Sequence, residues 1–381
     1  MRRSMNNSSL SLVTVEPTSS ADRTILQEEM FHRMISLERK RTERSGNPFL
    51  LMLLDVGETG SSNRESKVLA KILSALTATT RETDVIGWYQ DGSVVGVMYT
   101  EISVEDRAQI LSTMMTRVSE TLRHHLSLEI FSRISISFHL FPEEWNHEGL
   151  QRPSNPMLYP DLDRRDDSKR VLTGVKRIMD IAGSVAALIA FSPVFLGIAL
   201  AIKLTSQGPI FFRQQRIGQY GVPFTFLKFR SMRVNNDASI HKEYVRQLIA
   251  GQADSKSKTN GTGIYKLTND NRITKIGGFI RRTSLDELPQ FINVLLGEMS
   301  LVGPRPAIGY EVEAYDTWHR RRVLEAKPGI TGLWQVEGRS RVKFDDMVRL
   351  DLRYANNWSP WMDVKILLKT PAAMLFTEGA V

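Results

Sequence analysis

The sequence contains no cysteine, which excludes a disulfide framework and any metal site built from thiolates. A reducing compartment is compatible with this composition. The first residues are rich in Arg, Ser and Asn, and no apolar stretch there is long enough for the core of a signal peptide. We expect residues 1–21 to form a disordered tail.

Acidic side chains are scarce in the C-terminal half of the chain. From Val171 onward, 29 Lys and Arg residues outnumber 18 Asp and Glu residues, whereas the residues before it carry a net charge of −3. A basic surface suits nucleic acid, phosphorylated small molecules or anionic lipid headgroups, and charge alone does not choose among them. Because the chain lacks a recognisable nucleic-acid module, we expect no nucleic acid partner.

The length of 381 residues allows two domains with separate cores. Charged helical stretches and apolar strand-like runs alternate in residues 22–142, which predicts an α/β domain. An Asp91-Gly92 turn there predicts a hairpin. The expected helices span 24–44, 64–80 and 104–125, and the expected strands 49–56, 84–89, 94–99 and 134–141. Residues 143–173 lack periodicity and are rich in Pro, Asp, Arg and Asn, which indicates a linker.

Residues 174–204 form the strongest compositional feature of the chain. Between Ile178 and Leu204 the only ionisable residues are Asp180 and Lys203, which predicts a membrane segment. A buried core helix is the alternative. If the segment does enter the membrane, a straight span is the alternative to the re-entrant helix described next.

The favoured topology is a re-entrant helix broken at Ser192-Pro193. Proline removes a backbone donor and clashes with the preceding turn, so a break is expected at this pair. The arm before the break reaches only about 20 Å, which is short of a hydrocarbon core of roughly 30 Å. Positive residues flank both ends of the segment, which favours placing both ends on the cytoplasmic side.

Residues 205–381 contain the motifs that can carry chemistry. Asp286 and Glu287 are adjacent carboxylates in a segment, 281–290, that we expect to begin an amphipathic helix with Ser284 at its N-cap. An ionised carboxylate there is a plausible nucleophile toward phosphorus. The alternative is that both are ordinary acids of a first helical turn. Amphipathic patterns at 307–324 and 361–376 suit either a membrane surface or a protein core.

Arginines near this pair favour a phosphate ligand. A guanidinium group can form bidentate hydrogen bonds to two phosphate oxygens and stays charged. Arg282 and Arg305 are the candidates for this role. The prolines on both sides of Arg305 restrict its backbone. Lys228 and Arg230 alternate with phenylalanines in a strand-like run and are further candidates, although any single one of these cations could be a surface residue.

Several ordered motifs resemble the monotopic phosphoglycosyl transferases, the bacterial sugar transferases. The resemblance covers about residues 171–376. The motifs are Lys176-Arg-Ile-Met-Asp180, Ser192-Pro193, Gly208-Pro209, Lys228-Phe-Arg-Ser-Met232, Thr283-Ser-Leu-Asp-Glu-Leu-Pro-Gln290, Leu301-Val-Gly-Pro-Arg-Pro306 and Pro328-Gly-Ile-Thr-Gly-Leu-Trp-Gln335.

The resemblance implies a reaction and a set of roles. Enzymes of this family transfer a sugar 1-phosphate from a nucleoside-diphosphate sugar, usually a UDP-sugar, to polyprenyl phosphate, with Mg²⁺, and release the nucleoside monophosphate, here expected to be UMP. Asp286 would be the nucleophile and Glu287 the Mg²⁺ ligand. Substrate contacts would come from Arg282, Arg305, Lys228, Arg230, Gln335 and Arg339. Glu337 departs from the family pattern, which commonly has Asn there. The implied fold is a mostly α-helical domain with a re-entrant helix, on the cytoplasmic leaflet of the bacterial inner membrane.

Residues 22–142 resemble, more weakly, a degenerate diguanylate cyclase (GGDEF) domain. The loop that carries the signature reads Gln90-Asp91-Gly92-Ser93-Val94, so no cyclase activity is expected. Arg81 and Asp84 match the inhibitory RxxD pattern of that family, from which we hypothesise a site for cyclic di-GMP. The alternative is a surface salt bridge on a domain kept for homodimerisation. For the whole chain, the competing function is a membrane-tethered signalling or scaffold protein with an inactive transferase domain.

Overall fold

The computed structural model describes residues 25–57, 63–100, 102, 107–143, 155–162, 170–233, 239–249, 272–338 and 343–375. The expected tail at 1–21 and an insert at 254–263, which we expect to lie near the active site, fall outside these residues. The chain divides into two compact units. The first comprises the chain up to His32 and Leu50–Phe138, and the second comprises Arg33–Phe49 and His139–Val381. The domain boundaries drawn from the sequence remain predictions.

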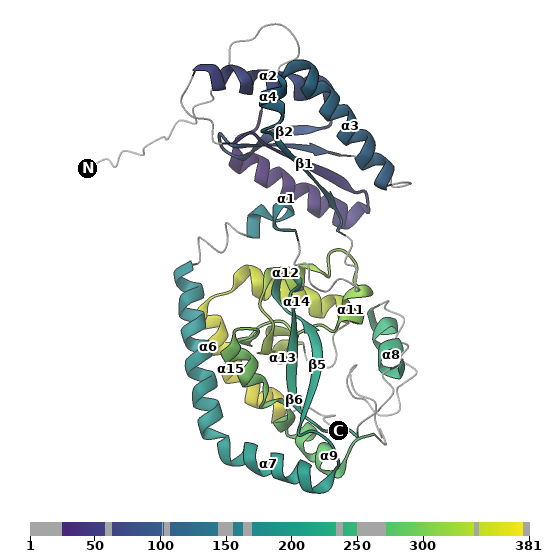
Figure 1. Cartoon of the computed structure of the whole chain (residues 1–381). Helices are drawn as coiled ribbons and strands as arrows, with labels where there is room; N and C mark the ends of the chain where they lie inside the picture. The colour runs from purple at the N-terminus through teal and green to yellow at the C-terminus, as the bar shows by residue number, and fades with distance from the viewer. Residues whose placement is uncertain are drawn as a thin grey trace, which may run out of the picture. The chain divides into compact units, whose positions relative to one another are not determined.

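The first unit is built on a four-stranded sheet in the order β2-β3-β1-β4 (Figure 1). The predicted hairpin is confirmed, since β2 and β3 pair antiparallel and Gly92 in their turn has a φ of +71°. Phe31 packs against Gly87 and Gly96, where a Cβ would collide with its ring. The strands of the sheet are β1 (Phe49–Asp55), β2 (Val85–Gln90), β3 (Val94–Tyr99) and β4 (Ser135–Phe141). The helices up to β4 are α1 (Glu28–Ser45), α2 (Asn63–Thr79), α3 (Arg107–His125) and α4 (Leu128–Phe131). The part of α1 from Arg33 and the part of β4 from His139 belong to the second unit.

The rest of the described chain is mostly helical, with two small two-stranded sheets. β5 and β6 pair antiparallel, and β7 and β8 pair parallel. The strands are β5 (Phe211–Ile217), β6 (Pro223–Phe229), β7 (Ser300–Val302) and β8 (Gly329–Thr331). The helices and 3-10 turns are η2 (Pro156–Leu158), α6 (Arg170–Ala190), α7 (Ser192–Thr205), η3 (Gln219–Gly221), α8 (Ser239–Ile249), α9 (Lys275–Arg282), η5 (Leu285–Glu287), α10 (Gln290–Leu296), α11 (Gly309–Glu313), α12 (Arg321–Glu325), α13 (Leu333–Glu337), α14 (Phe344–Asn357) and α15 (Pro360–Leu375).

The apolar segment breaks at the predicted place. In the described chain no single helix is long and apolar enough to cross a membrane, but α6 and α7 together pass that test and are bent by 62°. Pro193 lies in the first turn of α7, where its missing N–H is tolerated. The Ser192 hydroxyl donates to the Ile189 carbonyl at 2.8 Å, which satisfies an acceptor at the end of α6.

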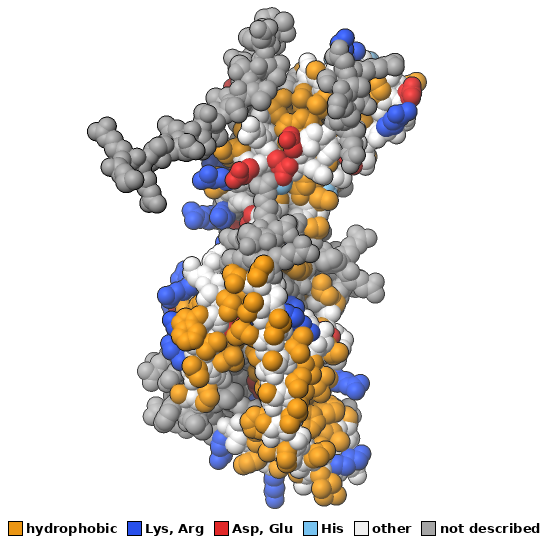
Figure 2. Space-filling model, turned by 90° about the vertical axis from the view of Figure 1, so that its left-hand side faces the viewer, with side chains coloured by type: hydrophobic (Ala, Val, Ile, Leu, Met, Phe, Trp, Pro, Cys, Tyr) orange, Lys and Arg blue, Asp and Glu red, His pale blue; other side chains and the backbone are white. Residues whose placement is uncertain are grey.

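Hydrophobic side chains cover the outer surface of this helix pair (Figure 2). Leucines 196, 200 and 204 of α7 are between 61% and 76% exposed, and Ile178 and Ile189 of α6 are each 69% exposed. Exposed apolar surface of this extent indicates a partner or a lipid phase. A core helix, the alternative in the sequence interpretation, would not leave these side chains uncovered.

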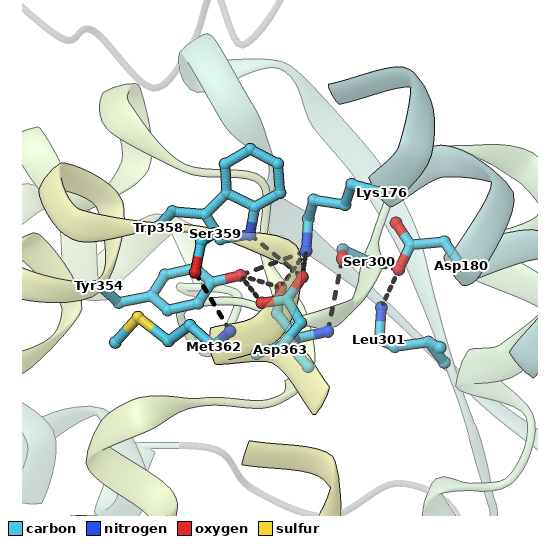
Figure 3. A network of polar contacts seen from close by, with 10 residues as sticks. Lys176, Asp180, Ser300, Leu301, Tyr354, Trp358, Ser359, Met362 and Asp363 are labelled. Carbon is cyan, nitrogen blue, oxygen red and sulfur yellow. Dashed lines mark hydrogen bonds and ion pairs between the residues drawn. The ribbon is translucent and has the colours of Figure 1, made fainter. Parts of the chain in front are cut away.

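The opposite side of α6 is held by a polar network (Figure 3). The Lys176 ammonium donates to the Asp363 carboxylate at 2.6 Å, to the Tyr354 hydroxyl at 3.2 Å and to the Val302 carbonyl at 3.0 Å. One turn later, the buried Asp180 carboxylate accepts from the Ser300 hydroxyl and from the Leu301 N–H, both at 2.9 Å. The charged residues of the Lys176–Asp180 motif therefore fasten α6 to β7 and α15.

The amphipathic pattern at 361–376 is confirmed as α15, whereas the pattern at 307–324 is not one helix. Only the short helices α11 and α12 form there, joined by turns. His319 lies in that connection, buried between the rings of Tyr315 and Phe344. Its imidazole bonds the Asp316 N–H and the Asp345 carboxylate, and these local contacts replace the expected helical ladder.

Candidate active site

The two adjacent carboxylates lie in a tight turn between α9 and α10. The α-helix expected to begin after Ser284 begins only at Gln290 as α10, and the preceding helix α9 ends at Arg282. Between them, Ser284 adopts a left-handed conformation with a φ of +56°, and its side chain makes no capping hydrogen bond. The pair sits in the 3-10 turn η5, so its negative charge is not stabilised by a long helix.

Lys228 on β6 supplies a positive charge beside the carboxylates of Asp286 and Glu287. Its ammonium donates to Glu287 Oε1 at 2.9 Å and lies 3.7 Å from Asp286 Oδ2. Lys228 lies on the same face of β6 as the buried Phe224 and Phe226, and its ammonium lies 5.6 Å from the centroid of the Phe226 ring. The structure therefore brings together three residues that the sequence interpretation assigns to the site.

The two carboxyl groups differ in their environments. Burial raises the pKa of Asp286 above its ordinary value; Lys228 opposes this shift and the Glu287 carboxylate adds to it. Burial would also raise the pKa of Glu287, but the Lys228 ammonium and then Arg305 outweigh it, so that this pKa is lowered. Glu287 is therefore the more firmly ionised member, and Asp286 the more basic one.

Arg305 approaches the same site from the loop after β7. Its guanidinium lies 3.9 Å from the buried Glu311 carboxylate, and its charge lowers the pKa of Glu287.

Arg216 on β5 is a neighbour that the motifs do not assign to the site. Burial, and next the charge of Arg305, lower the Arg216 pKa to about 10. Its signal in the sequence is weak, because an arginine on a strand is most often exposed.

The remaining candidate cations are placed differently. Arg230 is buried and donates to the carbonyls of Gln207 and Ser206 and to the Ser206 hydroxyl, so it binds the end of α7. Arg282 is exposed, and its side chain forms no hydrogen bond or ion pair with any described residue. After Lys228, it is the charge of the neighbouring Arg281 that lowers the pKa of Asp286. The substrate contacts assigned to Arg230 and Arg282 remain predictions.

Gln335 lies beside the loop of Arg305. Its neighbour Gly332 packs so closely on Gly303 that a Cβ there would collide with the Gly303 carbonyl oxygen and lie 3.3 Å from Gln335 Oε1. This oxygen is buried and accepts no hydrogen bond from any described residue. Gln335 therefore stays a candidate ligand contact, whereas Arg339 falls outside the described residues.

The predicted cyclic di-GMP residues lie in the first unit. Asp84 is buried, and its two carboxylate oxygens accept from the N–H groups of Arg81 at 2.7 Å and of Thr100 at 3.4 Å. The bond from Arg81 closes the turn before β2, and the bond from Thr100 ties that turn to the residue after β3, which is a structural role for Asp84. Arg81 is exposed. The cyclic di-GMP site and the homodimer remain predictions.

A metal site can be tested against the side chains present. No group of three or more His, Asp or Glu residues able to hold a metal occurs among the described residues. Mg²⁺ commonly binds one or two carboxylates and completes its shell with substrate phosphates and water. The ionised Glu287 carboxylate fits the single-carboxylate form of such a site.

Comparison with known proteins identifies the same family that the sequence motifs resemble. A model of the family described as "Bacterial sugar transferase" matches residues 171–377, which is more than half of the chain. The chain therefore belongs to the bacterial sugar transferase family.

Three similar proteins illustrate the relationship. The chain is 46% identical over 213 residues to an uncharacterized sugar transferase of Haemophilus influenzae and 44% identical over 216 residues to the undecaprenyl-phosphate galactose phosphotransferase of Salmonella typhimurium. Each match covers 56% of this chain and 43% of the relative, so the chain spans less than half of their length. The exopolysaccharide production protein ExoY of Rhizobium meliloti is 37% identical over 228 residues, covering 60% of this chain and 96% of that protein.

Among solved structures, a DGC protein from Thermotoga maritima matches with a TM-score of 0.26 and 21% identity, over 32% of this chain and 85% of that one. The GGDEF domain of DgcB from Caulobacter crescentus, in complex with c-di-GMP, also matches with a TM-score of 0.26, at 13% identity and over 34% of this chain and 78% of that one. The GGDEF-like character of the first unit continues to rest on its residues.

Proposed function

We propose that the chain transfers a sugar 1-phosphate from a UDP-sugar to polyprenyl phosphate, of the undecaprenyl type, on the cytoplasmic face of the bacterial inner membrane. The observation that carries the proposal is the buried Asp286 beside a Glu287 carboxylate paired with Lys228, in a domain of the bacterial sugar transferase family. The Salmonella relative is named for a galactose phosphotransferase acting on undecaprenyl phosphate, which supports the substrate classes.

The proposed reaction has two displacements at phosphorus. The Asp286 carboxylate attacks the phosphorus that bears the sugar, the bond to the bridging oxygen breaks, and UMP leaves. An oxygen of polyprenyl phosphate then attacks the same phosphorus and Asp286 departs, which yields a polyprenyl diphosphate sugar. A covalent intermediate lets a soluble and a lipid substrate react in turn at one carboxylate.

The neighbouring side chains fit this chemistry. The raised pKa of Asp286 makes its ionised form the better nucleophile, since nucleophilicity rises with basicity. Lys228 and Arg305 would stabilise the charge on the transferring phosphoryl group and on the departing UMP. Glu287 would hold Mg²⁺, which would neutralise charge on the diphosphate when bound.

The membrane location follows from the apolar helix pair. α6 and α7 would enter the bilayer, bend at the Ser192-Pro193 break and return to the same face. This re-entrant arrangement keeps the charged ends of the segment in the cytoplasm. The phosphate of the lipid substrate then needs to reach only the headgroup plane. The product would serve the first membrane step of a bacterial glycan, such as an exopolysaccharide, capsule or O-antigen.

The test is UMP release by the full chain in lipid nanodiscs. The enzyme is incubated with a panel of UDP-sugars, polyprenyl phosphate and Mg²⁺, and Asp286→Asn is compared with Asp316→Asn, a matched change at an acid whose side chain is 75% exposed. We expect wild type and Asp316→Asn to release UMP and Asp286→Asn to release none. Absence of release by wild type with every UDP-sugar would favour the inactive scaffold instead.

A further inference from the structure

The loop that carries Arg305 is fixed at four successive carbonyl oxygens. The Pro304 oxygen accepts from the Gly329 N–H, and the Ala307 oxygen accepts from the Ile217 N–H, both at 2.8 Å. Between them, the Arg305 oxygen accepts from Arg322 at 3.3 Å and the Pro306 oxygen accepts from Arg216 at 2.7 Å. Donors from three separate segments therefore hold this loop.

The sequence of the loop explains why side chains are needed there. Pro304 and Pro306 have no N–H, so the loop offers mainly acceptors and cannot pair as an ordinary strand. A buried carbonyl without a donor is costly. Two guanidinium groups, Arg322 and Arg216, fill this requirement, and both are buried, at 3% and 7% exposure.

Arg322 is itself held by Asp351 of α14. Their closest charged atoms are 2.7 Å apart, and both side chains are almost completely buried. A buried ion pair often contributes no more stability than apolar residues of the same volume. Stability alone therefore does not account for a charged pair at this place, whereas a donor aimed at the Arg305 carbonyl does.

From these contacts we propose that Arg322 and Asp351 are positioning residues that set the direction of Arg305 toward the Glu287 site. Asp351 orients the Arg322 guanidinium, Arg322 fixes the Arg305 carbonyl, and the Arg305 side chain then lies near Glu311 and Glu287. The inference rests on the proposed function, because Arg305 is taken to act on the substrate phosphates. Neither positioning residue touches the substrate.

The test is a double-mutant cycle on the full chain in nanodiscs. Replacing the buried pair by Arg322→Met with Asp351→Leu keeps the interior filled and removes the donor to Arg305, so folding is retained. We expect kcat/KM for the UDP-sugar to fall about tenfold to a hundredfold, as is typical of a misplaced catalytic group. In an Arg305→Ala background, the same pair replacement should cause no further loss, because its effect passes through Arg305.

Two controls separate positioning from general damage. Asp346→Asn on the same helix removes an exposed pair with Arg349 and should leave kcat/KM unchanged. Asp351→Asn is a second variant that changes only one member of the pair. Its thermal unfolding midpoint shows whether the protein is still folded at the temperature of the activity assay. A loss of kcat/KM that is equal in the wild-type and Arg305→Ala backgrounds would overturn the inference while the proposed function stands. Failure of wild type to release UMP would overturn both.

Discussion

At the scale of single residues, Lys228 is the side chain on which the carboxylate pair depends. It donates a hydrogen bond to Glu287 and, among the described residues, is the cation that forms an ion pair with Asp286. Lys228→Met should therefore lower kcat for UMP release by about a hundredfold, in the range found when a stabilising donor is removed from an active site. Lys228→Arg keeps the charge and should retain more activity than Lys228→Met, and equal activity of the two variants would contradict this role.

Asp351 gives a prediction about stability and pH. Burial raises the pKa of Asp351 to about 6, whereas an unfolded Asp has a pKa of about 3.9. The folded state therefore binds a proton at Asp351 more tightly than the unfolded state does. The stability that this proton confers is fully present below about pH 4 and is lost as the pH rises through about 6. The unfolding free energy of Asp351→Asn minus that of wild type should therefore rise by about 2 kcal/mol from pH 4 to pH 7.

Chemical denaturation at several pH values measures this difference, because the other titrating groups are common to both proteins. A difference between Asp351→Asn and wild type that does not change with pH would contradict the shifted pKa.

The residue scale also shows where sequence reasoning succeeds and where it stops. Residue types together with the family resemblance indicate Asp286, Glu287, Lys228 and Arg305, whereas residue types alone leave an ordinary helix start and surface cations as alternatives. Arg230 is only two positions from Lys228, yet it follows the end of β6 and binds the end of α7. Its partner Ser206 is 24 residues away, so no local pattern could indicate this contact.

At the scale of elements, the attachment of α6 depends on the Lys176 and Asp363 pair. The Lys176 side chain is 16% exposed and that of Asp363 is 4% exposed, so removal of one partner leaves a largely buried charge. Lys176→Met should lower the free energy of unfolding by about 3 kcal/mol. Lys369→Met is the matched control, because its pair with Glu337 is exposed and 3.9 Å long and should contribute almost nothing.

Thermal unfolding in detergent compares these two variants. Equal midpoints for Lys176→Met and Lys369→Met would mean that the network drawn in Figure 3 does not fasten α6.

Element boundaries are predictable where periodicity or proline determines them. The break at Ser192-Pro193 and the hairpin at Asp91-Gly92 follow from local backbone chemistry. The turn that holds Asp286 does not follow, because its left-handed Ser284 has no signal in a sequence that otherwise resembles a helix start. Nor does the pattern at 307–324 reveal that contacts of His319 divide it.

At the scale of the whole molecule, the topology of the helix pair can be measured directly because the chain has no cysteine of its own. Single cysteines at Lys169 and Arg213 can be labelled from either side of oriented membrane vesicles. The re-entrant arrangement predicts that both react from the cytoplasmic side only. Labelling of the two positions from opposite sides would show a straight span instead.

The central claim for the whole molecule is that transfer passes through a phosphosugar bound to Asp286. Its most direct test is a single turnover with a UDP-sugar whose sugar-bearing phosphate is radiolabelled, in the absence of polyprenyl phosphate. Wild type should release about one equivalent of UMP and carry the label on the protein, as expected of a covalent intermediate, and Asp286→Asn should do neither. Label on the Asp286→Asn protein, or UMP release by wild type only when polyprenyl phosphate is added, would contradict the account.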